Sequence, residues 1–189
     1  LSITPKGENP IPLALLNYPD NKLNKEIIFL NDAKETGLEE VKMKSPDCTL
    51  KPVCNPFRRE VIYVCGPSGS GKSFYTMMYA QSYRQLFPKN PIYVFSRLSE
   101  DPSLDQLKPI RVQIDEDLLD DPIDCVKDLA NSLVIFDDTD TVHDKKLKVA
   151  IDKLKDDIMQ VARKSNVYIV ITSHVINKNS ETRVTMEEC

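Results

Sequence analysis

The chain has 189 residues, of which 41% are hydrophobic and 29% are charged, enough apolar sequence for the core of one ordinary domain. Its formal net charge of −4 argues against a protein that coats nucleic acid or an anionic membrane indiscriminately. No run approaches the roughly 18 consecutive apolar residues of a membrane-spanning helix, so we expect no membrane span.

The five cysteines are scattered along the chain, and no two of them form a C-x-x-C pair. Because His143 and His174 are the only imidazole ligands, the sequence argues against a zinc site. We therefore expect free thiols in a reducing compartment, which predicts a cytoplasmic protein.

Prolines interrupt residues 1–57 repeatedly and leave short apolar runs at 11–16, 27–30 and 41–43. Proline cannot donate a backbone hydrogen bond, so these runs suit edge strands or extended segments better than helices. The sequence thus predicts a small, mostly β or extended N-terminal extension at 1–57, followed by a core domain at 58–189.

From residue 60 onward, the pattern alternates between short apolar runs and amphipathic stretches. The predicted strands, some of them continuous apolar runs, are 61–65, 92–95, 110–114, 133–136 and 167–171. The predicted helices span 73–87, 121–131 and a stretch that Thr141 and Asp144 open as a capping box, with an apolar stripe of Leu147, Ile151, Leu154, Ile158 and Val161. Residues 98–109 are polar and are predicted to be a long loop. This alternation predicts an α/β fold with a mainly parallel central sheet flanked by helices.

A glycine-rich motif lies between the first core strand and the helix that follows it. Its residues are Gly66, Pro67, Ser68, Gly69, Ser70, Gly71, Lys72 and Ser73, which match G-x-x-x-x-G-K-S at every fixed position. Glycines allow successive backbone N–H groups to turn toward an anion, and the start of the helix adds the positive end of its dipole. The lysine is expected to contact the β- and γ-phosphates, and the serine hydroxyl to bind Mg²⁺. The motif in this context predicts a P-loop NTPase fold that binds ATP.

Two aspartates follow the buried strand 133–136 directly. This strand resembles the Walker B strand of P-loop ATPases, in which the first acidic residue holds Mg²⁺, so we expect Asp137 to bind the metal together with Ser73. Asp138 stands where many such ATPases have a glutamate that orients the attacking water, which makes it a candidate catalytic residue.

Polar residues also end the last predicted strand, at Thr172, Ser173 and His174. In ATPases with an added central strand, a polar residue at this point senses the γ-phosphate. Since side chains alternate along a strand, only one or two of the three can face the nucleotide. We favour Ser173, with His174 next.

The segments GPSGSGKS, IYVFSR, LVIFDD and ITSH together resemble the genome-packaging ATPases of large double-stranded DNA viruses, which are similar to the FtsK/HerA DNA translocases. The resemblance covers roughly residues 60–180. It implies a Mg²⁺-dependent motor, assembled as a homo-oligomeric ring, that pushes double-stranded DNA into a preformed shell. Viral capsid or vertex proteins would be its partners, in the host-cell cytoplasm or the virion. Two positions depart from the pattern, because Asp138 replaces glutamate and Ser-His replaces the glutamine common among translocases.

Three other classes can be compared with this interpretation. A switch GTPase needs N-K-x-D, but Ser180 replaces the aspartate after Asn177 and Lys178. A small-molecule or nucleotide kinase would fit the size, yet the arginines beyond the first core helix form no cluster like that of a kinase lid. A nucleotide-binding assembly protein with little turnover remains an alternative that only measured hydrolysis separates from the motor.

Ring ATPases complete their site with an arginine from the neighbouring subunit. Arg97, Arg163 and Arg183 are the candidates in this sequence. P-loop cores usually have one more strand than the sequence supplies after residue 171, so we expect a C-terminal part to be missing from it.

Overall fold

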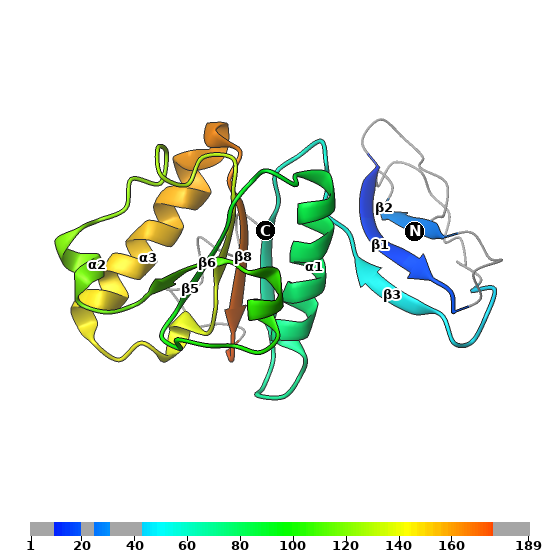
Figure 1. The fold of residues 1–189 in the computed structure, drawn as a ribbon, viewed down its shortest axis with the longest axis horizontal. Coiled ribbons are helices and arrows are strands. Elements are labelled where there is room, and N and C mark those ends of the chain that lie inside the picture. The colour runs from blue at the N-terminus through cyan, green and yellow to red at the C-terminus, as the bar shows by residue number, and fades with distance from the viewer. Residues whose placement is uncertain (1–9, 20–24, 31–42, 176–189) are drawn as a thin grey trace. The chain divides into compact units, whose positions relative to one another are not determined.

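The computed structural model describes residues 10–19, 25–30 and 43–175 of the chain. The chain divides into two compact units, Leu1–Pro56 and Phe57–Cys189 (Figure 1). Within the described ranges, no helix is long and apolar enough to cross a membrane.

The first unit contains an antiparallel sheet of three strands in the order β2-β1-β3. Its strands are β1 (Ile11–Asn17), β2 (Glu26–Leu30) and β3 (Thr49–Pro52). The predicted β-rich extension is therefore confirmed, although β1 lies at the centre of the sheet and not at an edge. The central strand tolerates Pro12 because the register shifts between Pro12 and Ala14, and the pairing with β3 begins only at Ala14. Residues 41 and 42 of the predicted apolar run 41–43 lie outside the described residues.

The second unit contains a sheet of five strands in the order β4-β8-β7-β5-β6, and every neighbouring pair is parallel. Its strands are β4 (Val61–Cys65), β5 (Ile92–Ser96), β6 (Ile110–Gln113), β7 (Leu133–Phe136) and β8 (Tyr168–Ser173). All residues of β7 and β8 are buried, as expected for central strands covered on both faces. The five strands predicted from the sequence and the parallel sheet are confirmed.

Two long helices cover this sheet. The helix α1 (Lys72–Leu86) leads from β4 to β5, and α3 (Lys145–Gln160) leads from β7 back to β8. These two crossovers run in opposite directions along the sheet, so right-handed connections place the helices on opposite faces, as Figure 1 shows. On the α1 side, the rings of Tyr83, Phe87 and Tyr168 contact one another. On the other face, Ile151, Leu154 and Ile158 of α3 belong to the buried core.

Short elements fill the connections. The predicted loop 98–109 contains the 3-10 helix η1 (Leu104–Leu107), whose two leucines are buried. The remaining short elements are α2 (Asp117–Asp120), η2 (Thr139–Thr141) and η3 (Ala162–Ser165).

The predicted helix at 121–131 is wrong, because turns occupy these residues. The Asp124 carboxylate accepts hydrogen bonds from the backbone N–H groups of Val126 and Lys127, and Asp128 accepts one from Asp124 N–H. Such local bonds give the backbone an alternative to the helical pattern. Asn131 also adopts a left-handed conformation, with φ of 53°.

The predicted start of α3 is also wrong. Asp144 is the N-cap, because its Oδ1 accepts hydrogen bonds from the N–H groups of Lys146 at 2.9 Å and Leu147 at 3.0 Å. Thr141 belongs to η2 instead. At the other end of the predicted stripe, α3 finishes at Gln160, and Val161 is exposed.

The parallel strands place their carboxyl ends at one edge of the sheet. In open α/β sheets this edge is where ligands bind. The phosphate loop follows β4 and the two aspartates follow β7. Between these strands lies β8, whose last residues are Thr172 and Ser173, with His174 directly after them.

Candidate functional site

The phosphate loop connects β4 to α1 at this edge. Gly69 and Gly71 have φ values of 76° and 91°, a left-handed region that strains any residue with a Cβ atom. At Gly66 the space is limited instead, since an added Cβ would lie 2.6 Å from Ser70 Oγ and the Ser70 side chain would have to shift. Residues 67–71 are exposed, so the backbone of the loop is accessible to a ligand.

Lys72 turns its side chain back over the loop and is only 8% exposed. Its Nζ donates a hydrogen bond to the carbonyl oxygen of Gly66 at 3.1 Å and lies 3.5 Å from that of Pro67. It also lies 3.7 Å from Asp138 Oδ1 and 3.4 Å from His174 Nδ1. The lysine therefore meets groups from all three chain segments at the edge.

Asp137 is buried at the end of β7, with 5% of its surface exposed. Its N–H donates to the carbonyl of Phe95 at 2.9 Å, which extends the pairing with β5 by one residue. Burial, and after it the charge of Asp138, raises the pKa of Asp137 above the ordinary value, while a hydrogen bond from Thr172 acts in the opposite direction. A buried carboxylate beside a second carboxylate is an arrangement that a bound cation would stabilise.

Asp138 has a left-handed backbone conformation, with φ of 46° and ψ of 37°. An aspartate tolerates this conformation better than most residues, but it remains uncommon outside glycine. The backbone N–H of Asp138 donates to Thr172 Oγ1 at 2.9 Å, and its carboxylate lies against Lys72 and His174. The uncommon backbone conformation of Asp138 therefore occurs at a residue whose side chain contacts charged groups of the site.

The end of β8 presents three polar residues with different partners. Thr172 Oγ1 lies 3.1 Å from Asp137 Oδ1 and 3.2 Å from Asp138 Oδ1. The Ser173 hydroxyl lies 3.0 Å from Asp140 Oδ2 and 3.1 Å from the carbonyl of Val175. His174 Nε2 lies 3.0 Å from Asp138 Oδ2. The structure thus places Thr172 and His174 against the acidic pair, whereas Ser173 is directed to Asp140.

Hard oxygen donors of the kind that Mg²⁺ prefers are present at this edge. The sequence predicts the Ser73 hydroxyl and the Asp137 carboxylate as the metal ligands, and both donor types fit that ion. Among the described residues, Asp138, Asp140 and His174 also bring one ligand atom each within 4.8 Å of one another.

Asp140 is the residue of this site that sequence reasoning missed, whereas Thr172 is one of the three candidates at the end of the last strand, ranked behind Ser173 and His174. Asp140 carried a weak signal, because it follows the acidic pair by only two residues in Asp137-Asp138-Thr139-Asp140. Its contact with β8 depends on β8 lying next to β7, which the sequence does not state.

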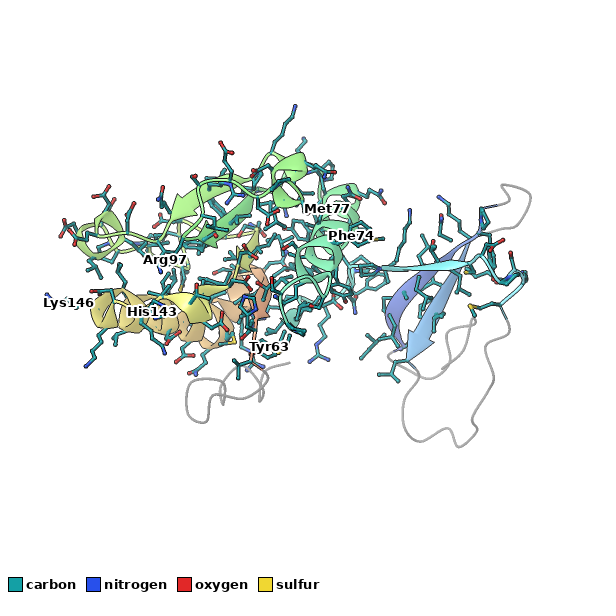
Figure 2. All side chains as sticks on the ribbon, turned by 90° about the horizontal axis from the view of Figure 1, so that it is seen from below. Tyr63, Phe74, Met77, Arg97, His143 and Lys146 are labelled. Carbon is teal, nitrogen blue, oxygen red and sulfur yellow. The ribbon has the colours of Figure 1, made fainter. Side chains whose placement is uncertain are left out.

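The arginine candidates lie in different places. Arg97 follows β5 at the site edge, and its Nη1 donates to the carbonyl of Thr141 at 3.3 Å (Figure 2). Arg163 lies in η3, before the start of β8 and therefore near the opposite edge of the sheet. Arg183 lies outside the described residues.

No protein-family model matches the chain. Over 162 residues it is 40% identical to "Uncharacterized protein V3" of Sputnik virophage, a match that covers 85% of this chain and 64% of that protein. The chain therefore spans slightly less than two thirds of this relative's length.

Two solved structures are similar in fold. The cytoplasmic domain of EssC superposes with a TM-score of 0.53 and 16% sequence identity, over 96% of this chain and 35% of that one. The pCW3 conjugation coupling protein TcpA, solved in its monomer form with ATPgS, gives a TM-score of 0.49 and 12% identity, over 95% of this chain and 64% of that one. The likeness to EssC shows the fold, an α/β domain with a mostly parallel five-stranded sheet flanked by helices.

Proposed function

We propose that this chain binds ATP together with Mg²⁺ and hydrolyses it at the edge formed by the phosphate loop, the acidic pair and the end of β8. The observation that supports the proposal is the distance of 3.7 Å between Lys72 Nζ and Asp138 Oδ1. Two motifs that are far apart in the sequence, one suited to phosphate and one to metal and water, meet at this point.

The phosphate loop supplies the binding of the triphosphate. Its exposed backbone and the N-terminus of α1 offer N–H groups and a positive dipole to the phosphate oxygens. Lys72 adds a full positive charge. A bound triphosphate would replace the carbonyls of Gly66 and Pro67 and the carboxylate of Asp138 as partners of the lysine, which would leave Asp138 available for water.

Ser73 and Asp137 would hold the Mg²⁺ ion. When bound, the ion neutralises negative charge on the β- and γ-phosphates. Asp138, with its carboxylate held beside the lysine, would orient the attacking water and accept its proton. Ser173 remains the residue that the sequence favours for a contact with the γ-phosphate, and in the structure its hydroxyl is held by Asp140.

The more specific proposal is a DNA-translocating motor that packages a viral genome, working as a homo-oligomeric ring on double-stranded DNA with capsid or vertex proteins as partners. It is supported by the resemblance of the four motifs to the packaging ATPases. The 40% identical relative from a virophage is consistent with a viral role, although that protein is uncharacterized.

Hydrolysis assays on two aspartate variants test the division of roles in the site. Asp137→Asn should weaken the Mg²⁺ dependence of ATP binding. Asp138→Asn should bind ATP as wild type does and lower kcat by roughly 10²- to 10⁴-fold, the usual contribution of a group that handles the proton. Asp120→Asn, an exposed aspartate on α2, is the matched control and should change neither quantity.

The same assays separate the alternatives. Equal losses of ATP affinity in Asp137→Asn and Asp138→Asn would contradict the division of roles. Transfer of the γ-phosphate to an added small acceptor in place of water would indicate a kinase. ATP binding without turnover in wild type, with double-stranded DNA present, would indicate an assembly protein.

A further inference from the structure

One carboxylate oxygen of another segment accepts two hydrogen bonds from the end of β8. Asp140 Oδ2 accepts hydrogen bonds from the Ser173 hydroxyl at 3.0 Å and from the backbone N–H of His174 at 2.9 Å. Asp140 belongs to η2, the 3-10 turn that directly follows the acidic pair. One aspartate thus ties the turn after β7 to the last residues of β8.

The bond to His174 falls where the sheet no longer fixes the backbone. The pairing of β4 with β8 ends at Cys65 and Ser173, and the Ser173 carbonyl accepts a final bond from Gly66 N–H at 3.1 Å. His174 lies one residue beyond. Its N–H has a carboxylate acceptor in place of a strand partner, and a bond to a charged acceptor is stronger than one between neutral groups.

The imidazole of His174 lies between the two charged groups that the proposed reaction needs. Its Nε2 is 3.0 Å from Asp138 Oδ2, and its Nδ1 is 3.4 Å from Lys72 Nζ. The orientation of a side chain depends on the backbone that carries it. A backbone at His174 that could rotate freely would not keep both ring nitrogens at these distances.

We propose that Asp140 is a positioning residue, which fixes the end of β8 so that the His174 imidazole bridges Lys72 and Asp138. The effect of Asp140 on catalysis rests on the proposed function. His174 then contacts Lys72 and Asp138, while the same Asp140 oxygen accepts the hydrogen bond of the Ser173 hydroxyl. Asp140 acts through His174 and does not itself touch the reacting groups.

Asp144 offers a matched control four residues later. One of its oxygens also accepts two hydrogen bonds, from Lys146 N–H and Leu147 N–H, but it does so as the N-cap of α3. Asp144→Ala should lower the melting temperature, because it removes a helix cap. It should leave His174 unchanged. If Asp140 had a purely structural role, Asp140→Ala would likewise lower the melting temperature and leave the His174 resonances unchanged.

The direct test uses the fact that the chain has two histidines. Imidazole ¹⁵N and ¹H resonances would be recorded without nucleotide or Mg²⁺ for wild type, Asp140→Ala, Asp140→Asn and Asp144→Ala, and assigned with His143→Gln. Asp140→Ala should shift the His174 resonances and leave those of the exposed His143 in place. Asp140→Asn should stay close to wild type, because an amide oxygen has two lone pairs for the same two donors. If Asp140→Ala does not fold, Asp140→Ser replaces it, because the serine side chain is shorter than that of aspartate.

Kinetics then test the consequence for the reaction. Asp140→Ala should lower kcat by about 10- to 100-fold, the scale expected when a site group is displaced by about 1 Å. The Kd for Mg-ATP should change little. The effect of Asp140→Ala on kcat should largely disappear in a His174→Ala background, because the two residues act through one contact.

An unmoved His174 resonance in Asp140→Ala, or losses of kcat that simply add in the double variant, would overturn the proposal. If wild type neither binds nor hydrolyses ATP, the proposed function fails on its own. The resonance comparison needs no nucleotide, so it still decides whether Asp140 positions His174.

Discussion

At the scale of single residues, Thr172 has a central place in the site. The residue is 1% exposed. Its hydroxyl accepts a hydrogen bond from Asp138 N–H and lies within donating distance of one oxygen from each aspartate of the pair. A hydroxyl has only one proton, so it can donate to one of the two carboxylates at a time. Thr172 therefore links the two acidic residues to β8.

Replacing this hydroxyl by a methyl group tests the link. Thr172→Val keeps the shape of the side chain, but it leaves the Asp138 N–H without its acceptor. A buried donor without a partner costs about 1–3 kcal/mol, so the free energy of unfolding in urea should fall by that amount. Thr172→Ser, which retains the hydroxyl, is the control and should lose clearly less. Equal losses in the two variants would show that the methyl group contributes as much to stability as the hydroxyl, which would contradict the central place of the hydrogen bonds.

The negative charge of Asp137, which the proposed metal site needs, should lower the stability of the folded chain. Burial and the neighbouring Asp138 raise its pKa, so its negative charge destabilises the folded chain at pH 7 relative to the unfolded chain. Asp137→Asn should therefore raise the free energy of unfolding at pH 7, measured without Mg²⁺ and nucleotide, by about 0.5–2 kcal/mol, the range of typical stabilising changes.

The pH dependence of this gain has a definite sign. Wild type takes up the proton as the pH falls, which removes the same charge, so the gain should vanish below the ordinary aspartate pKa of about 3.9. Asp120→Asn, at an exposed position, should show no such dependence. A variant that is less stable than wild type at pH 7 would contradict this account of Asp137.

The residues of the candidate site differ in how far the sequence could predict them. The phosphate loop and Asp137 follow from local motifs, since each is a short pattern next to a strand whose apolar run is clear. Asp140 and its contact with the end of β8 do not, because the contact forms only when β8 inserts between β4 and β7. The preference for Ser173 over His174 stays a prediction that the kinetics of the two positions can test.

At the scale of elements, Arg59, which precedes β4, connects the end of α3 with the start of β8. Its guanidinium donates to the carbonyls of Ile158 at 3.1 Å and Met159 at 2.6 Å in the last turn of α3, and to the carbonyl of Val167 at 3.3 Å just before β8. The last carbonyls of a helix have no partners within the helix. Arg59 thus fixes the end of α3 relative to the start of β8.

Arg59→Met should weaken this connection without removing the aliphatic part of the side chain. Hydrogen bonds made by charged groups are worth about 1.5–3 kcal/mol, so we expect a loss of stability of that size in thermal or urea unfolding. Arg58→Met, at the exposed neighbouring position, is the matched control and should stay within about 0.5 kcal/mol of wild type. Similar losses in both variants would contradict the role of Arg59.

The sequence predicted the long elements better than the short ones. Continuous apolar runs identified the strands of the parallel sheet, and the phosphate motif identified the start of α1. In place of the predicted helix at 121–131, the side chains of Asp124 and Asp128 accept hydrogen bonds from backbone N–H groups two to four residues away. The start of α3 was placed at Thr141 because a capping box was expected, but Asp144 alone caps the helix.

At the scale of the whole molecule, the chain forms two compact units. The chain covers 64% of its virophage relative, so the activity of a complete protein of that kind is a proposal for this chain. Within the second unit, the parallel order of the strands brings the phosphate loop and the acidic pair to one edge. That edge is exposed at residues 67–71, where a neighbouring subunit could contribute a group.

A ring motor predicts that activity depends on assembly. ATP hydrolysis per subunit should rise with protein concentration and with added double-stranded DNA. An arginine from a neighbouring subunit is worth about 10³- to 10⁵-fold in rate, so Arg97→Ala mixed into wild type should lower activity more than dilution does if Arg97 has this role. Arg163→Ala and Arg183→Ala would be tested in the same way. A rate per subunit that is flat with concentration and unaffected by DNA would contradict the motor.

If a triphosphate binds between Lys72 and the acidic pair, equilibrium titration with Mg-ATP should detect it. Lys72→Ala removes the charge that the loop directs at the phosphates, whereas Lys89→Ala removes an exposed lysine beyond the end of α1. We expect saturable binding by wild type and Lys89→Ala, and its loss in Lys72→Ala. Unchanged ATP affinity in a folded Lys72→Ala variant would contradict this expectation.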